Sequence, residues 1–182
     1  MQVFLIAAVT VDGLIAKDIK SPSTTWTSQA DKAFFQQRTK KAGVVVMGRK
    51  TFATVGKPLP GRLNIVYSRQ TRAELLGTAA KQFSKEQLQV TQAQPQQLVK
   101  QLAAQGLTEL AICGGSTIYT MFMQAGVVNR LYLTVEPVIF GQGLTLFKRS
   151  LEPKLKLINS RQLNDQGTIL LEYQLLKDSA RN

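Results

Sequence analysis

Apolar residues in this chain gather in short runs of strand length, with helical spacing between them. Runs without polar interruption are typical of strands that are covered on both faces of a sheet. Runs of this kind predict strands at residues 2–9, 44–47, 64–67 and 109–113, and shorter or alternating patterns predict strands at 87–91 and 130–138. Strands that alternate with helical patterns indicate parallel pairing through crossover helices.

Helix signals occupy the intervals between these strands. Ser28 is a predicted N-cap, and the moderately amphipathic pattern that follows extends to about Lys41. Pro95 suits the first turn of another helix, which runs to about Gln105 and which Gly106 would close. Two shorter helices are expected after the strand ends at residues 48–51 and 114–117.

The last part of the chain predicts a hairpin, with strands at 155–163 and 168–176 around a turn at 164–167. The whole pattern predicts an α/β fold with a mixed, mostly parallel sheet and an antiparallel C-terminal edge. Residues 1–182 show no repeat and no linker, so we expect a single domain. Residues 17–27 are expected to form a polar loop, and residues 70–86, which are polar and basic, are interpreted only as an exposed excursion.

Composition narrows the class of protein. The 182 residues are 44% hydrophobic, which is ordinary for a globular protein with a sizeable core. No apolar run reaches membrane-spanning length, and the N-terminal segment lacks the features of a secretory signal. Cys113 is the only cysteine, which excludes an intrachain disulfide and a thiolate metal cluster. These features predict a cytoplasmic protein.

The absence of histidine and the positive net charge limit which reactions and ligands the protein can have. The chain has no histidine, so Ser-His-Asp and Cys-His mechanisms and His-ligated metals are excluded, and no metal is expected. A carboxylate, Lys, Tyr or water must carry any proton. The formal charge of +12 suits either nucleic acid or small phosphorylated ligands. Because the basic residues are spread along the chain without an RNA-binding motif, nucleic acid is the less favoured partner.

Three strand ends carry residues that bind anions. The clusters are Gly48-Arg49-Lys50-Thr51, Ser68-Arg69 and Gly114-Gly115-Ser116-Thr117. Main-chain N–H groups, hydroxyls and arginines at the carboxyl ends of strands favour a phosphate-bearing ligand. Each cluster alone could be an ordinary turn with solvated basic residues, but several in succession favour a shared ligand. The G-x-G-x-x-G fingerprint of a standard dinucleotide fold is absent.

Several single residues permit two interpretations. Asp31 stands at capping-box spacing from Ser28, and spacing alone favours a cap over a carboxylate that binds an amino-substituted heterocycle. Trp26 could be a core anchor or could cover a site, and Arg62 could be a solvated turn residue or an anion clamp. Structural roles are favoured for Cys113, as a small buried apolar residue, and for Asp12 and Glu136.

Taken together, these segments resemble the dihydrofolate reductase superfamily along almost the full chain. The resemblance lies in LIAAVTVDGLIA at 5–16, Trp26 followed by Asp31, ADKAFF, VMGRKTF, GKPLPGRLNIVYSR, GGSTIY and RLYLT, in that family's order. It implies a three-layer fold with a mixed eight-stranded sheet, about four helices and a nicotinamide cofactor over the strand ends. It also implies that Asp31 is an active-site carboxylate, partnered by the hydroxyl of Thr134.

The resemblance further assigns binding residues by position. The substrate would contact Ala8, Trp26, Lys32, Phe35, Val55, Leu59 and Arg62. The cofactor would contact Ala8, Ile15, Gly48, Arg49, Lys50, Thr51, Ser68, Arg69, Cys113, Gly114, Gly115, Ser116, Thr117 and Tyr119. Arg49, Ser68 and Arg69 would meet a 2′-phosphate, which favours NADPH over NADH. A cis peptide would join Gly114 to Gly115, and a homodimer would be common among such relatives.

Departures from folate reductases shift the expected substrate. Lys32 replaces an apolar residue that would face the benzoyl part of folate, and a lysine there suits a phosphate. Residues 136–147 are more similar to the reductase domain of riboflavin biosynthesis, although that group's Asp-Asp-Pro-x-Leu-Thr-x-Arg segment and its deaminase half are absent. We therefore expect an NADPH-dependent reductase of a C=N bond in a phosphoribosylamino-pyrimidine, with dihydrofolate reductase as the alternative and a nucleic-acid-binding module as a remote one.

Overall fold

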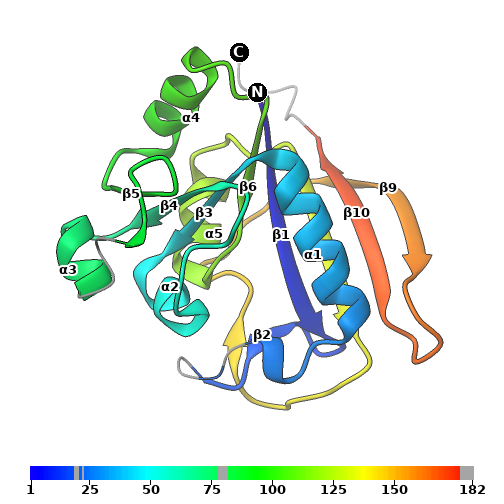
Figure 1. The fold of residues 1–182 in the computed structure, drawn as a ribbon. Helices are drawn as coiled ribbons and strands as arrows, with labels where there is room; N and C mark the ends of the chain where they lie inside the picture. Colours follow the sequence, from blue (N-terminus) through cyan, green and yellow to red (C-terminus); the bar gives the residue numbers. More distant parts are fainter. Residues whose placement is uncertain (19–20, 22, 78–81, 177–182) are drawn as a thin grey trace.

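The computed structural model describes residues 1–18, 21, 23–77 and 82–176. Eight strands form one sheet in the order β5-β4-β3-β6-β1-β7-β10-β9 (Figure 1). Their bounds are β1 Gln2–Thr10, β3 Val44–Gly48, β4 Leu63–Tyr67, β5 Leu88–Thr91, β6 Glu109–Ile112, β7 Arg130–Glu136, β9 Leu155–Gln162 and β10 Ile169–Leu175. A separate antiparallel pair joins β2 Leu14–Ala16 to β8 Leu144–Thr145.

The sheet is parallel except at its C-terminal edge. Each pair from β5 to β7 is parallel, and β10 then runs antiparallel to both β7 and β9. The predicted mixed sheet with a C-terminal hairpin is therefore confirmed. Strand β1 lies between β6 and β7, so both of its edges are hydrogen-bonded to neighbouring strands.

Helices cover both faces of the sheet, which gives the expected three layers (Figure 1). Successive side chains of a strand point to opposite faces, so Val3 and Leu5 of β1 pack toward one layer and Phe4 and Ile6 toward the other. The helices are α1 Gln29–Ala42, α2 Arg49–Val55, α3 Arg72–Leu76, α4 Pro95–Ala104 and α5 Ser116–Gln124. Side chains of α4 and α5 join the first core, and those of α1 and α2 join the second.

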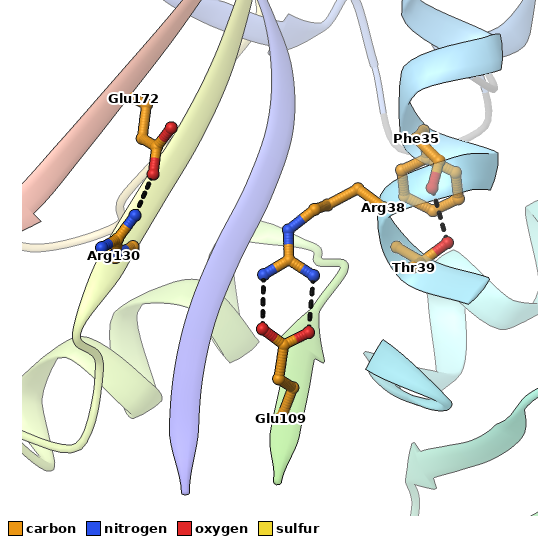
Figure 2. A network of polar contacts seen from close by, with 6 residues as sticks. All are labelled: Phe35, Arg38, Thr39, Glu109, Arg130 and Glu172. Carbon is orange, nitrogen blue, oxygen red and sulfur yellow. Dashed lines mark hydrogen bonds and ion pairs between the residues drawn. The ribbon is translucent and has the colours of Figure 1, made fainter. Parts of the chain in front are cut away.

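Helix α1 is rich in polar residues, and an arginine fastens it to the sheet. The Arg38 guanidinium donates to both oxygens of Glu109 at 2.7 and 3.0 Å, as Figure 2 shows. The same guanidinium stacks on the Phe4 ring, with 3.9 Å between the guanidinium carbon and the ring centroid. The polar side chain thus contributes apolar packing as well as charge, which positions α1 across β1 and β6.

Three elements differ from the sequence expectation. Helix α3 lies within 70–86, where no helix was predicted, so the described residues form five α-helices where about four were expected. A short 3-10 helix, Ser23–Thr25, lies in the stretch expected to be an irregular polar loop, and the β2–β8 pair was not predicted. Residues 19–20, 22 and 78–81 of these two stretches lie outside the described residues. In the described part of the chain, the helices are all too short or too polar to cross a membrane.

Candidate active site

A cleft of about 630 Å³ opens at the carboxyl ends of β1, β3 and β6. Most of the residues expected to bind substrate or cofactor line this central cleft: Ala8, Ile15, Asp31, Lys32, Phe35, Gly48, Arg49, Lys50, Thr51, Val55, Leu59, Cys113, Gly114, Gly115, Ser116, Thr117 and Tyr119. A second hollow of about 730 Å³, the outer hollow, includes Ser68 and Arg69. Arg49 and Tyr67 line both cavities, so the two are adjacent.

Two glycine turns meet in the central cleft. The main-chain N–H of Gly48 donates to the carbonyl of Gly114 at 2.7 Å, and the peptide between Gly114 and Gly115 is cis, as expected. A Cβ atom at Gly48 would lie 3.1 Å from the side chain of Ile118, and one at Gly115 would lie 3.2 Å from Thr51 Oγ1. A side chain at either glycine would therefore crowd its neighbour in the cleft.

The same turns present uncapped helix starts. Gly48 precedes α2 and Gly115 precedes α5, and neither residue can supply a side-chain cap. First-turn N–H groups without a cap carry a partial positive charge and suit an anion. The hydroxyl of Ser116 donates instead to the carbonyl of Thr145 at 2.6 Å, so it fixes the β8 segment against α5.

The outer hollow gathers the three residues expected to meet a 2′-phosphate. Arg49 and Arg69 are exposed, and neither forms an ion pair with the residues the structure describes. Ser68 is buried, and its Oγ accepts the main-chain N–H of Gln70 at 2.9 Å. Two free guanidiniums beside a fixed hydroxyl form a suitable site for a dianion.

Asp31 occupies the first turn of α1 with its carboxyl on the wall of the central cleft. The predicted N-cap is confirmed, because Ser28 Oγ accepts the main-chain N–H of Asp31 at 3.1 Å. The reciprocal half of a capping box does not come from Asp31. Glu136 of β7 accepts the N–H of Ser28 at 2.8 Å and its hydroxyl at 2.9 Å. Asp31 therefore lies at the start of the helix, but its carboxyl does not accept the capping hydrogen bond from Ser28.

Burial raises the pKa of the Asp31 carboxyl above its ordinary value. The hydroxyls of Thr134 and Thr27 act against this rise, the negative charge of Glu136 adds to it, and Lys32 acts against it. Thr134 is 1% exposed, and its Oγ1 makes no hydrogen bond of normal geometry with the described residues. A buried carboxyl beside a hydroxyl with unused hydrogen-bonding capacity is suited to a polar heterocycle.

Apart from Ser68 and Arg69 of the outer hollow, three residues assigned by resemblance do not line the central cleft: Trp26, Arg62 and Thr134. Arg62 is 6% exposed, and its guanidinium donates to the carbonyl of Pro60 at 3.1 Å, to Gln36 Oε1 at 2.6 Å and to Thr39 Oγ1. The structure thus uses Arg62 to join α1 to the turn before β4. Trp26 packs against Phe140, with 5.1 Å between ring centroids.

Other cleft residues have settled roles. Burial raises the pKa of the Cys113 thiol to about 12, so it stays protonated, in agreement with its expected apolar role. The Tyr119 hydroxyl donates to the carbonyl of Ile6 at 2.8 Å. Tyr67 and Lys148 also line the cleft but were not predicted. Tyr67 directly precedes the Ser68 cluster and could have been found, whereas Lys148 follows β8 and has no local signal.

Curated proteins are similar to this chain in sequence, and solved structures are similar to it in fold. Curated relatives include the dihydrofolate reductase of Bacillus subtilis, 29% identical over 100% of this chain and 96% of that protein. The dihydrofolate reductase of Haemophilus influenzae is 49% identical over 38% of this chain, and this stretch spans 41% of that protein.

Solved structures share the fold at low identity. A putative riboflavin biosynthesis protein from Shewanella sp. PV-4 has a TM-score of 0.77 at 20% identity, and the match covers 97% of this chain and 100% of that one. A deaminase/5-amino-6-(5-phosphoribosylamino)uracil reductase from Thermotoga maritima has a TM-score of 0.78 at 16% identity, covering 96% of this chain and 56% of that one. The family model for the RibD C-terminal domain matches residues 1–169. The chain therefore belongs to the RibD C-terminal domain family.

Proposed function

We propose that this protein is an NADPH-dependent reductase that transfers a hydride to the C=N bond of 5-amino-6-(5-phosphoribosylamino)uracil or a closely similar pyrimidine. The observation that carries the proposal is the arrangement of one buried carboxyl, Asp31, in a cleft that continues through two glycine turns into a hollow with two free arginines. Membership of the RibD C-terminal domain family supports the same activity.

The residues present fit NADPH. Arg49, Ser68 and Arg69 would hold the 2′-phosphate, and the uncapped starts of α2 and α5 would receive the pyrophosphate. Ala8 and Ile15 line the cleft with Asp31 and would border the nicotinamide end. Bound NADPH would supply the hydride.

Asp31 would orient the substrate by accepting hydrogen bonds from its amino and ring N–H groups. Its partly buried negative charge would also favour the protonated, more electrophilic imine. The Thr134 hydroxyl, which has unused capacity, would complete this contact. Because the chain has no histidine, water would deliver the proton.

Lys32 favours a phosphate-bearing substrate. It follows Asp31 on α1 and lines the same cleft, as does Lys148. Arg62, the other expected anion ligand, is engaged with Pro60, Gln36 and Thr39. A glutamate tail of folate would therefore lack the contact expected from Arg62, whereas a compact phosphate could be neutralised by the lysines. Dihydrofolate remains the second candidate because the curated relatives are dihydrofolate reductases.

The test follows NADPH absorbance with purified protein and each substrate in turn. Oxidation with the phosphoribosylamino-pyrimidine alone is expected, and oxidation only with dihydrofolate would transfer the assignment to folate chemistry. Failure to bind NADPH would refute both reductases, and salt-sensitive binding of DNA or RNA would then favour the nucleic-acid alternative. Asp31→Asn should abolish turnover and leave NADPH affinity nearly unchanged.

We also infer a homodimer that works in the cytoplasm as one domain spanning residues 1–182. Strand β9 supports the dimer, because it is the last strand of the sheet and all its residues are exposed, including Leu157 at 50% and Ile158 at 41%. Exposed edge strands with apolar residues are sites of pairing with another chain. Light scattering should give twice the chain mass, and Leu157→Lys should give a monomer.

A further inference from the structure

At the start of helix α1, the hydrogen-bond acceptor for the cap residue Ser28 is Glu136, which lies 108 positions away in the sequence. Glu136 Oε1 accepts two hydrogen bonds from Ser28, one from the main-chain N–H and one from the hydroxyl. Glu136 Oε2 accepts a third, from Thr168 Oγ1 at 2.8 Å. Asn164 Nδ2 in turn donates to Thr168 Oγ1 at 3.0 Å. Glu136 and Thr168 are 2% and 0% exposed, so this is an interior network.

Two carboxylates, those of Asp31 and Glu136, could accept the main-chain N–H of Ser28, and in the structure Glu136 does so. In a Ser-x-x-Asp start, the acid three residues after the cap is the local acceptor for the N–H of the cap residue. Were Asp31 to take that role, its carboxyl would turn back toward Ser28. Glu136 already fills the position, so the Asp31 carboxyl is left on the cleft wall.

Strand β7 reaches the site at two points. Thr134 and Glu136 are two residues apart, so their side chains point to the same face of the sheet. Thr134 lies near the Asp31 carboxyl, and Glu136 binds the residue that caps the Asp31 main chain. One strand thus supplies a group near the carboxyl of Asp31 and a group that holds the residue capping its main chain.

We propose that Glu136 is a positioning residue for the reaction: it occupies the helix-start donors that would otherwise engage Asp31, and it places a second carboxylate beside the Asp31 carboxyl. This inference rests on the proposed function for its kinetic consequence, but its structural consequence can be measured without catalysis. The groups that act on Asp31 are Glu136, Lys32 and the hydroxyls of Thr27 and Thr134, and Tyr119 also lies within electrostatic reach.

Glu136→Gln tests the proposal with little change in shape. The amide oxygen can still accept from Ser28, while the negative charge is lost. Because that charge raises the pKa of Asp31, the substitution should lower it. NMR of isotope-labelled aspartate carboxyls in the ligand-free protein would follow the titration, with Asp31→Asn identifying the signal. The Asp31 signal should titrate at lower pH, and the matching limb of the turnover profile should move in the same direction.

Glu136→Ala also frees the helix-start donors, so Asp31 should turn toward Ser28. Turnover should fall about tenfold or more, as expected when a catalytic group is misplaced, while NADPH affinity stays within about twofold of the parent. Should this variant fail to fold, Glu136→Gln still tests the proposal through the charge that it removes.

Glu109→Gln is the matched control. Glu109 is also a sheet glutamate bonded to α1, but its partner there is Arg38 (Figure 2). It should lower stability and leave the Asp31 titration in place. An unchanged Asp31 titration in Glu136→Gln, or an equal shift in Glu109→Gln, would overturn the inference. A shifted titration in a protein that oxidises no NADPH would instead refute the proposed function and leave the positioning role standing.

Discussion

The outer hollow allows a quantitative prediction about the choice between NADPH and NADH. Arg49 and Arg69 line the outer hollow together with Ser68, and neither has an ion-pair partner among the described residues. NADH lacks the 2′-phosphate, so in the proposed complex these guanidiniums would stabilise only the phosphorylated cofactor at that position.

The magnitude follows from the exposure of the two side chains. A hydrogen bond to a charged group contributes about 1.5–3 kcal/mol. Both arginines are exposed, and water weakens such pairs, so the lower end of that range applies. About 1.4 kcal/mol corresponds to tenfold in affinity. Each arginine should therefore contribute about tenfold to NADPH binding, and the pair about a hundredfold.

The assay is the dissociation constant for each cofactor, measured by quenching of Trp26 fluorescence with Arg49→Ala, Arg69→Ala and the double variant. NADPH should bind about tenfold, tenfold and a hundredfold more weakly, and the advantage over NADH should shrink as salt is added. Lys100→Ala is the control, because it removes the same charge from an exposed position on α4 that lines neither cavity.

Two results would refute this reasoning. An equal loss of NADH affinity would mean that the arginines contact a part common to both cofactors. Unchanged NADPH affinity in the double variant would mean that the outer hollow does not hold the cofactor.

Three further predictions concern the central cleft. Because the pKa of Asp31 is raised in the folded state, its contribution to stability is full below the unfolded pKa and is lost as pH rises through the folded pKa. Asp31→Asn should therefore raise the thermal midpoint of unfolding at neutral pH while abolishing turnover. A lower midpoint at every pH would show that the carboxylate stabilises the fold. Gly115→Ala adds a Cβ 3.2 Å from Thr51 Oγ1 without backbone strain, so overpacking should lower the free energy of unfolding by roughly 1–3 kcal/mol. The displaced turn should bind NADPH about tenfold more weakly in titration calorimetry, and unchanged affinity would exclude close approach of the cofactor. Lys32→Leu should raise KM for the phosphoribosylamino-pyrimidine about tenfold, as for one lost charge-assisted contact, and should not impair any activity with dihydrofolate; equal effects on both substrates would contradict a phosphate contact.

Local patterns predicted most of the sheet and the main helices. The apolar run 44–47 and the alternation at 130–138 correspond to β3 and β7. These strands could be predicted because the burial of each face of a strand determines which of its residues are apolar. The Ser28 cap was also local, and α1 begins at the next residue. Helix α3 was missed although Thr71 and Glu74 form a capping box at its start, because the polar residues around it hid a signal that was present.

The parts that escaped prediction depend on contacts between distant segments. Nothing near Glu136 indicates that it accepts from Ser28, and nothing near Arg62 indicates that Thr39 and Gln36 occupy its guanidinium. The β2–β8 pair joins segments about 130 positions apart, and each strand is too short to show a period. Resemblance to a family supplied the cleft residues that pattern alone left ambiguous, above all Asp31.

The hydrogen bond from Thr168 to Glu136 bears on the order in which this protein becomes complete during its synthesis. Helix α1 is synthesised early, but the network at its start includes Thr168, which directly precedes β10 near the end of the chain. At roughly 5–20 residues per second, ribosomes need several seconds or more to make the intervening segment. A nascent chain lacking the final hairpin could form most of the parallel sheet while the start of α1 still lacked its Thr168-braced acceptor. Catalytic competence should therefore appear only when the last strands dock, which would keep truncated products inactive.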